Sequence, residues 1–257
     1  MNIIGIIPAR LASTRFPNKP LAEILGIPMI GHVYHRSKLC SVLSEVYVAT
    51  CDKEIVEYIE SIGGKAIMTA NTHERASDRT AEAMLKIEKQ TGKRIDIVVM
   101  IQGDEAMVTP QMIENVTKPL IENKEIYIAN LTTELKSENE ENDPNEVKVV
   151  VDKEYNAMYF SREPIPSRKK GGGSFSMLKQ VAIIPFQRDF LLKYNNMEQT
   201  PLEKIESVDM LRIIENGMKV KMIYTDNQTY GVDTKEDLAH VEKCMESDNL
   251  FLQYRNK

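Results

Sequence analysis

The first half of the chain alternates short apolar runs with longer stretches in which apolar residues recur at helical spacing. The expected strands are Ile3–Ile7, Glu45–Ala49, Lys65–Met68, Ile95–Ile101 and Ile126–Leu131, and the expected helices are Met29–Leu39, Lys53–Ile62, Asp78–Gln90 and Pro110–Asn123. Such alternation predicts an α/β fold with a mostly parallel sheet, because parallel strands need crossover helices. The loops that follow the strands then share one edge of the sheet, where we expect a ligand to bind.

The pattern changes after residue 133. Glu134–Pro144 is highly charged and is expected to be an exposed loop. Further strands are expected at Val147–Val151, Tyr155–Phe160 and Gln180–Pro185, with a loop at Gly171–Gly173, before a helix at Val208–Glu215, a strand at Val220–Tyr224 and a helix at Lys235–Met245. We interpret residues 1–257 as one domain that carries a β-rich, sheet-forming insertion at about 145–200. This insertion is the expected dimerisation surface.

Composition narrows the class of protein. The 257 residues are 42% hydrophobic and 28% charged, as in soluble globular proteins, and the net charge of −5 argues against general nucleic-acid binding. The three cysteines lack the spacing of a zinc site or a disulfide framework. Ile3–Ile7 is too short for a signal peptide, and no stretch has the length of a membrane span. We therefore expect a cytoplasmic protein that contacts neither nucleic acid nor membrane.

The loop after the first strand is the most informative segment. It reads Pro8-Ala9-Arg10-Leu11-Ala12-Ser13-Thr14-Arg15-Phe16-Pro17-Asn18-Lys19-Pro20-Leu21. Arg10, Arg15 and Lys19 lie close together at the carboxyl end of a buried strand, so they can converge on a polyphosphate. The alternative is a solvated basic loop. The segment is not a P-loop, because the required glycine and lysine spacing is absent.

Two acidic loops follow other strands. Gln102-Gly103-Asp104-Glu105 comes directly after the strand at Ile95–Ile101, and Asp233 precedes the last expected helix. Each has a simpler explanation, since Gly-Asp is often only a turn and Asp233 or Thr234 can merely cap the helix. Together, Asp104 and Asp233 predict a two-carboxylate metal site, because Mg²⁺ prefers oxygen ligands.

These three segments together resemble a known family. The order I-I-P-A-R-x-A-S-T-R-x-P-x-K-P-L, then Q-G-D-E, then G-V-D-T-x-E-D-L is similar to that of the CMP-Kdo synthetases, the 3-deoxy-manno-octulosonate cytidylyltransferases. The match runs in order from about residue 3 to 245. It includes Met68-Thr69, His73, Asp78-Arg79, Val147–Val150, Tyr159–Arg162, Pro164–Pro166, Pro201–Glu203 and Leu211-Arg212.

The resemblance implies a nucleotide-diphospho-sugar transferase fold (Rossmann-like), a homodimer and a Mg²⁺-dependent reaction. CMP would pass from CTP to the anomeric hydroxyl of an acidic sugar, a 3-deoxy-ulosonic acid, with release of pyrophosphate. The residues implied at the nucleotide are Pro8, Ala9, Arg10, Ser13, Arg15, Lys19, Thr69, His73, Ser77, Arg79, Gln102 and Asp104. Those implied at the acceptor are Gln102, Arg162, Gln180, Glu203, Glu206 and Asp209, and those implied at the metal are Asp104 and Asp233. Arg10, Arg15, Lys19, Asp104 and Asp233 are the expected catalytic set.

The sequence also departs from the family pattern. The motif H-x-G-x-Y becomes Gln180-Val181-Ala182-Ile183-Ile184, and a Glu-Gln pair becomes Asp209-Met210. The nucleotide-side motifs are better kept, although Ala106 replaces a Pro and Arg75-Ala76 replaces Ser-Gly. We therefore predict an acceptor other than plain Kdo, such as an amino, acyl or deoxy variant. The alternative is that these substitutions arose by drift and are compensated elsewhere in the chain, so that the acceptor is unchanged.

A second class of function is a nucleotide-binding regulatory or scaffold protein without turnover. The retained Arg10, Lys19, Asp104 and Asp233 argue against it, because loss of turnover would be expected to remove metal ligands and phosphate-binding cations first.

Overall fold

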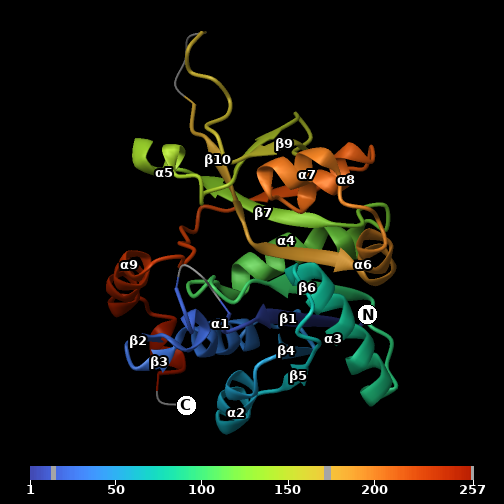
Figure 1. The fold of residues 1–257 in the computed structure, drawn as a ribbon, viewed down its shortest axis with the longest axis vertical. Helices are drawn as coiled ribbons and strands as arrows, with labels where there is room; N and C mark the ends of the chain where they lie inside the picture. The colour runs from blue at the N-terminus through green and yellow to red at the C-terminus, as the bar shows by residue number, and fades with distance from the viewer. Residues whose placement is uncertain (13–15, 171–174, 256–257) are drawn as a thin grey trace.

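The computed structural model describes residues 1–12, 16–170 and 175–255. It contains two five-stranded sheets, one above the other in Figure 1, and a small hairpin. The first sheet has the strand order β11-β6-β1-β4-β5. Its strands are β1 (Ile3–Ala9), β4 (Glu45–Thr50), β5 (Ala66–Met68), β6 (Ile97–Ile101) and β11 (Ile183–Gln187). All pairings in it are parallel except that of β11 with β6, so the mostly parallel α/β sheet is confirmed.

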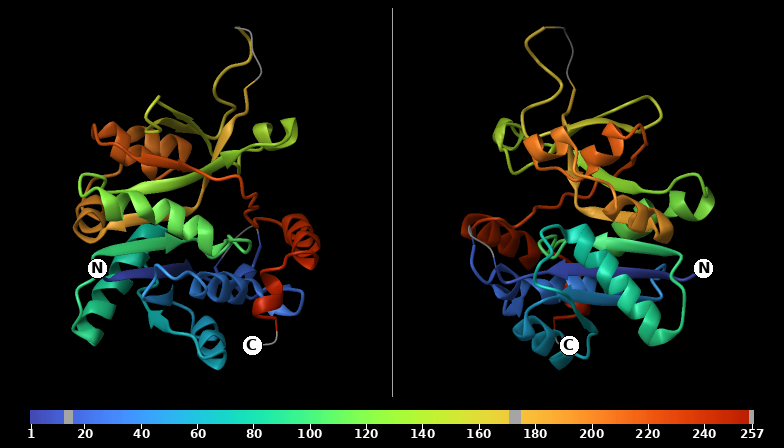
Figure 2. Two further views of the ribbon diagram at one scale, coloured as in Figure 1. Left: turned by 180° about the vertical axis from the view of Figure 1, so that it is seen from behind. Right: turned by 45° about the vertical axis from the view of Figure 1, so that its right-hand side comes forward.

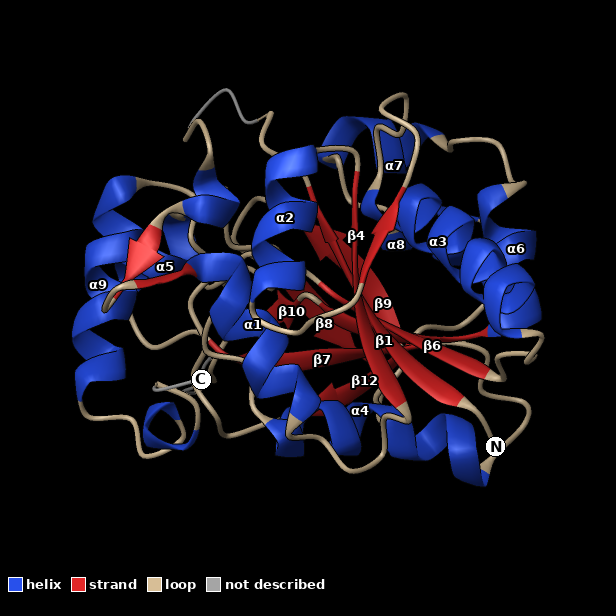
Figure 3. Cartoon of the chain, turned by 90° about the horizontal axis from the view of Figure 1, so that it is seen from below, coloured by secondary structure: helices blue, strands red, loops and turns tan. Residues whose placement is uncertain are grey.

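The first sheet is apolar because both of its faces are covered. In β1, Ile4 and Ile6 pack in one core cluster with α3 (Ala76–Thr91), whereas Ile3 and Ile7 pack in a second with α1 (Met29–Lys38). Figure 3 shows α1 and α3 on opposite sides of β1. A strand that is buried on both faces has a continuous apolar sequence. This is why the sequence of β1 predicts a buried strand. The remaining helices around this sheet are α2 (Lys53–Ser61), α4 (Pro110–Glu122) and α6 (Arg188–Asn195).

The second sheet has the order β12-β7-β10-β8-β9. Its strands are β7 (Ala129–Glu134), β8 (Lys148–Val151), β9 (Ala157–Ser161), β10 (Leu178–Val181) and β12 (Lys221–Tyr224). Only β12 pairs in parallel, with β7. The helices α7 (Pro201–Glu206) and α8 (Met210–Glu215) lie beside this sheet, and α4 contacts strands of both sheets (Figure 2). Because α4 packs against both sheets, the two sheets belong to one structural unit.

The remaining elements gather around α1. They are the hairpin β2 (Glu23–Ile24) and β3 (Ile27–Pro28), the 3-10 turns η1 (Lys19–Leu21) and η2 (Phe251–Gln253), and α9 (Lys235–Glu246). Arg36 in α1 donates to Asp248 Oδ2 at 2.5 Å and to the carbonyl of Val108 at 2.7 Å. These contacts fix the C-terminal segment, and with it the loop before α9.

Several expectations of chain organisation were wrong. Ile126–Leu131 was expected in the first sheet, but β7 opens the second one. Gln180–Pro185 was expected as one strand, but the chain crosses between sheets at Ala182, so that β10 and β11 belong to different sheets. The second sheet also recruits β7 and β12, which lie outside residues 145–200.

Short helices also went unrecognised. Glu134–Pro144 was expected to be a loop but contains the helix α5 (Glu138–Asn142), whose N-cap Ser137 accepts from the backbone N–H of Glu140. The helices α6 and α7 were not expected at all. The expected loop at Gly171–Gly173 lies outside the described residues. The three cysteines were expected to be free, buried thiols; all are free, but only Cys40 is buried, while Cys51 and Cys244 are partly exposed. None of the helices in the described segments is long and apolar enough to cross a membrane.

Candidate active site

A cavity of about 630 Å³ is lined by residues of both sheets. This is the size of an ordinary small-molecule site. Its walls come from the loops after β1 and β6, the start of α3, the crossing from β10 to β11, the start of α8 and the loop before α9. The predicted ligand edge of the first sheet therefore opens into this cavity, and the second sheet closes it from the other side.

Lys19 joins the two acidic loops at one place in the cavity. Its Nζ donates to Asp104 Oδ2 at 2.9 Å, to Asp233 Oδ1 at 3.2 Å and to the carbonyl of Val232 at 2.6 Å. An ammonium has three N–H groups, so these contacts satisfy all of them. Burial would lower the pKa of Lys19, but the Asp104 and Asp233 carboxylates outweigh it and raise that pKa, which keeps the ammonium charged.

Thr234, and not Asp233, is the residue whose side chain caps α9. Thr234 is the N-cap of α9: its side chain accepts from the N–H of Asp237 at 3.1 Å, and the Asp237 carboxylate accepts in return from the N–H of Thr234 at 2.8 Å. Val232 donates its N–H to the carbonyl of Asp104 at 3.3 Å, which ties the two loops together. Of the two explanations left open for Asp233, its carboxylate thus joins the Lys19 cluster, while Thr234 caps the helix.

The donor set at this point fits a Mg²⁺ ion that arrives with a nucleotide. The side chains of Asp104 and Asp233 are 27% and 28% exposed, so both carboxylates reach the cavity. Mg²⁺ usually takes one or two carboxylates and completes its shell with phosphate oxygens and water. In residues 1–12, 16–170 and 175–255 no group of three or more acidic, histidine or cysteine side chains forms a cage for a metal alone.

Glu105 is a cavity residue to which sequence reasoning gave no role. Its carboxylate accepts from Thr229 Oγ1 at 2.7 Å and from the N–H of Ala182 at 3.1 Å. Burial, followed by the charge of neighbouring Asp104, raises the pKa of Glu105. Glu105 therefore fastens the Asp104 loop to the point where the chain crosses between the sheets. An acidic residue directly after Asp104 was the only sequence signal for it.

Most residues implied at the nucleotide lie on or just behind the cavity wall. Pro8, Ala9, Arg10, His73, Arg79 and Gln102 line it. Arg79 is buried and donates to Thr69 Oγ1 at 2.5 Å, so Thr69 lies behind Arg79. His73 pairs with Glu82 of α3. Ser13 and Arg15 lie outside the described residues.

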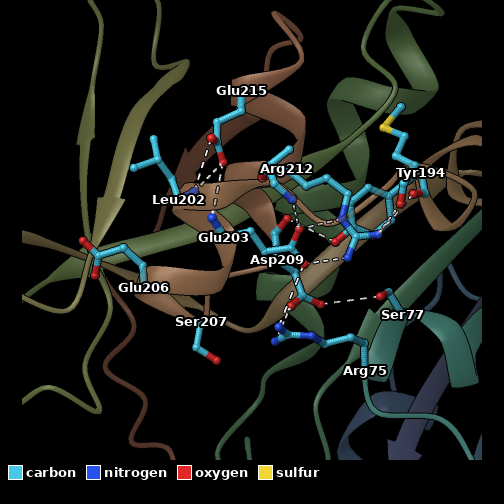
Figure 4. A network of polar contacts seen from close by, with 12 residues as sticks. Arg75, Ser77, Tyr194, Leu202, Glu203, Glu206, Ser207, Asp209, Arg212 and Glu215 are labelled. Atoms are coloured by element: carbon cyan, nitrogen blue, oxygen red, sulfur yellow. Dashed lines mark hydrogen bonds and ion pairs between the residues drawn. The ribbon is translucent and has the colours of Figure 1, made fainter.

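The residues implied at the acceptor divide into two groups. Gln102, Arg162, Gln180 and Asp209 line the cavity, whereas Glu203 and Glu206 do not. Glu203 is fully buried and accepts from Arg212 Nε at 2.8 Å, as Figure 4 shows. Glu206 accepts from the N–H of Arg162 at 2.8 Å and from Ser161 Oγ at 3.0 Å. The geometry thus makes Glu203 and Glu206 supports of the wall and gives no support to direct acceptor contacts.

Arg162 is held by the backbone. Its guanidinium donates to the carbonyls of Pro144 at 2.6 Å, Glu206 at 2.7 Å and Ser207 at 3.3 Å. It therefore fixes the loop between α7 and α8 against the second sheet, and only its remaining donors are left for a ligand.

Most of the departures from the family pattern lie on the cavity wall. Arg75, Gln180, Ala182, Ile184, Asp209 and Met210 all line it. Ile184 and Met210 are buried apolar side chains, and Gln180 donates to Asn130 Oδ1 at 2.5 Å. Arg75 was grouped with the nucleotide-side changes, but its Nη1 lies 2.9 Å from Asp209 Oδ1. It therefore belongs with the changes around Asp209.

Comparisons with known proteins show the family of this chain. Residues 4–220 match the family described as cytidylyltransferase. The 3-deoxy-manno-octulosonate cytidylyltransferase of Geobacter metallireducens is 42% identical over 251 residues, covering 94% of this chain and 96% of the relative. The mitochondrial enzyme of the same name from Arabidopsis thaliana is 40% identical over 250 residues, covering 96% of this chain and 84% of the relative.

Two solved structures share the fold. A CMP:2-keto-3-deoxy-manno-octonic acid synthetase complexed with CTP has a TM-score of 0.87 and 36% identity, with 96% of this chain and 99% of that chain covered. A cytidylyltransferase from Leptospira borgpetersenii has a TM-score of 0.62 and 17% identity, with 96% and 88% covered, and supports the fold alone.

Proposed function

This chain belongs to the cytidylyltransferase family, among the 3-deoxy-manno-octulosonate cytidylyltransferases, and we propose that it transfers CMP from CTP to the anomeric hydroxyl of a 3-deoxy-ulosonic acid. The observation that carries the proposal is the Lys19, Asp104 and Asp233 cluster, which three separate loops assemble inside the cavity. A cation and two metal-binding carboxylates at one point suit a triphosphate substrate.

The reaction forms a bond between the acceptor oxygen and the α-phosphorus and breaks the bond to the β-phosphate, so pyrophosphate leaves. Negative charge grows on the leaving group and on the non-bridging oxygens. Arg10 and the charged Lys19 lie on the wall where they can stabilise that charge. Asp104 and Asp233 would hold Mg²⁺, which supplies Lewis-acid stabilisation of the α-phosphate and acidifies the attacking hydroxyl.

Three finer features are also proposed. The enzyme depends on Mg²⁺, because the two carboxylates suit that ion. It acts in the cytoplasm, because CTP is an intracellular nucleotide. It is a homodimer, as the resemblance implies, and the exposed Met158 on the edge strand β9 is compatible with a covered surface there.

A nucleotide panel tests the proposal. With Mg²⁺ and a ulosonic acid, we expect pyrophosphate release from CTP at least about tenfold faster than from ATP, GTP or UTP, and no release without the acceptor. Acceptor-independent release would point to plain CTP hydrolysis. Tight CTP binding without any release, across an acceptor panel, would favour the regulatory or scaffold alternative.

A second panel tests the acceptor. Because Ile184 and Met210 cannot hydrogen-bond sugar hydroxyls, each unpaired hydroxyl costs about 1–3 kcal/mol. We expect kcat/KM for plain Kdo to lie at least about tenfold below that for an amino, acyl or deoxy variant. If Kdo equals or exceeds every variant, the substitutions are compensated and the acceptor is Kdo itself.

A further inference from the structure

Arg75 and Asp209 form an ion pair on the cavity wall. Nη1 of Arg75 lies 2.9 Å from Asp209 Oδ1, and Nη2 lies 4.0 Å from Oε1 of the buried Glu203 (Figure 4). Ser77 Oγ donates to the other oxygen of Asp209 at 3.5 Å. These contacts hold the guanidinium in one place, as an ion pair with a partly buried carboxylate does.

Arg75 has donors to spare at this position. Nη2 is beyond hydrogen-bond distance of Glu203, and no residue in the described part of the chain accepts a hydrogen bond from Nε. The Arg75 side chain lines the cavity and is 23% exposed. A guanidinium has five N–H donors in a planar fork, which suits the oxygen atoms of a sugar or a carboxylate. The Arg75 guanidinium therefore has donors available at the cavity wall.

This pair is separate from the phosphate cluster. Lys19, Asp104 and Asp233 lie beside α1 and α9, whereas Arg75 begins α3 and Asp209 begins α8. Figure 1 places α9 at the left of the molecule and α3 and α8 at the right. Arg75 and Lys19 therefore come from different parts of the fold and line the same cavity.

The neighbours of Arg75 also differ from the family pattern. In the family pattern that the sequence resembles, Ser-Gly stands at Arg75-Ala76 and Glu-Gln at Asp209-Met210, whereas the loop that carries Arg10 and Lys19 keeps the pattern. Arg75 and Asp209 form one ion pair on the cavity wall, on elements other than those that carry Lys19, Asp104 and Asp233.

We propose that Arg75 is a specificity-determining residue for the acidic sugar, which it contacts through Nε and Nη2, with Asp209 as its positioning residue. The inference rests on the proposed function, because it assigns the acceptor of that reaction. CTP binding does not use this guanidinium.

The primary test compares Arg75→Ser and Arg75→Lys with wild type. At saturating CTP, Arg75→Ser raises KM for the acceptor about 10- to 100-fold, and Arg75→Lys gives an intermediate value, because Lys keeps the charge but not the fork. Calorimetry with Mg²⁺ and CTP gives a dissociation constant within about twofold of wild type for both variants. Arg94→Ser, which removes an exposed arginine that is also ion-paired, is the matched control and changes neither quantity.

A double variant separates recognition from folding. Arg75→Ser leaves Asp209 without its cation, so Arg75→Ser/Asp209→Asn removes both charges together. Because Asp209 acts through Arg75, the double variant raises the acceptor KM no further than Arg75→Ser alone, while Asp209→Asn alone raises it by a smaller factor. Circular dichroism and the melting temperature show that each variant is folded.

Three results would overturn the inference. The first is an unchanged KM for the acceptor in folded Arg75→Ser. The second is a loss of CTP affinity in Arg75→Ser by the same factor as the rise in the acceptor KM, and the third is an equal rise in the acceptor KM in the control Arg94→Ser. If wild type binds CTP but makes no CMP-sugar with any ulosonic acid, the proposed function itself fails, and the assignment of Arg75 fails with it.

Discussion

Replacing Asp104 or Asp233 with Asn is expected to reduce turnover by roughly two orders of magnitude or more, the scale of one lost strong transition-state interaction. Asn keeps the shape of the side chain but removes the charge that Lys19 and a divalent cation need. Both carboxylates face the cavity, so the fold survives and the melting temperature stays close to that of wild type. Steady-state pyrophosphate release against Mg²⁺ concentration is the measurement.

The control for this pair of variants is Asp237→Asn. Asp237 is acidic and lies in the same segment, but its carboxylate completes the capping box of α9. It should therefore lower stability by about 0.3–1 kcal/mol, because the first turn of α9 loses a negative charge, with a much smaller effect on turnover. The metal-site assignment would be wrong if both Asp104→Asn and Asp233→Asn kept rates near wild type with a normal dependence on Mg²⁺.

Lys19→Met is expected to lower kcat/KM for CTP by about 100-fold, since the charged ammonium is lost and a side chain of similar length is kept. The same variant has a second consequence. Without Lys19, the carboxylates of Asp104 and Asp233 lack their shared cation, so free Mn²⁺, used as a probe for Mg²⁺, should bind more tightly in the absence of nucleotide.

Two measurements check the role of Lys19. Kinetics report the loss with CTP, and Mn²⁺ titration followed by electron paramagnetic resonance reports the metal. Lys38→Met is the matched control, because Lys38 is an exposed lysine paired with Glu45 outside the cavity. If neither the rate with CTP nor the affinity for Mn²⁺ changes, the alternative interpretation of the loop as a solvated basic loop holds for Lys19.

The parts of the fold that sequence could predict are those whose pattern is local. Ile3–Ile7 reads as a buried strand because both faces of β1 are covered, and the loops after β1 and β6 had to meet at one edge. The sequence therefore predicted that the loops of Lys19 and Asp104 share one edge of the sheet, but not that the two side chains form an ion pair. Asp233 was harder, because a helix cap and a metal ligand have the same sequence signal, and only the position of Thr234 separates them.

The parts that could not be predicted depend on contacts between distant segments. Nothing local at Ala182 signals that the chain changes sheets, since Val181 and Ile183 are equally apolar and buried on either side of it. Glu203 and Glu206 looked like ligands, but their partners Arg212 and Arg162 become visible only when α7, α8 and β9 pack together. The Arg75–Asp209 pair joins residues 134 positions apart in the chain, beyond the reach of any spacing rule.

The product of the reaction tests the central claim most directly. Wild-type protein is incubated with CTP, Mg²⁺ and a panel of ulosonic acids that includes Kdo and its amino, acyl and deoxy variants, and the mixture is resolved by mass spectrometry. We expect a CMP-ulosonate and pyrophosphate in equal amounts, formed only with Mg²⁺ and greatly reduced in Asp104→Asn. A folded protein that binds CTP and yields no CMP-sugar with any acceptor of the panel would contradict it.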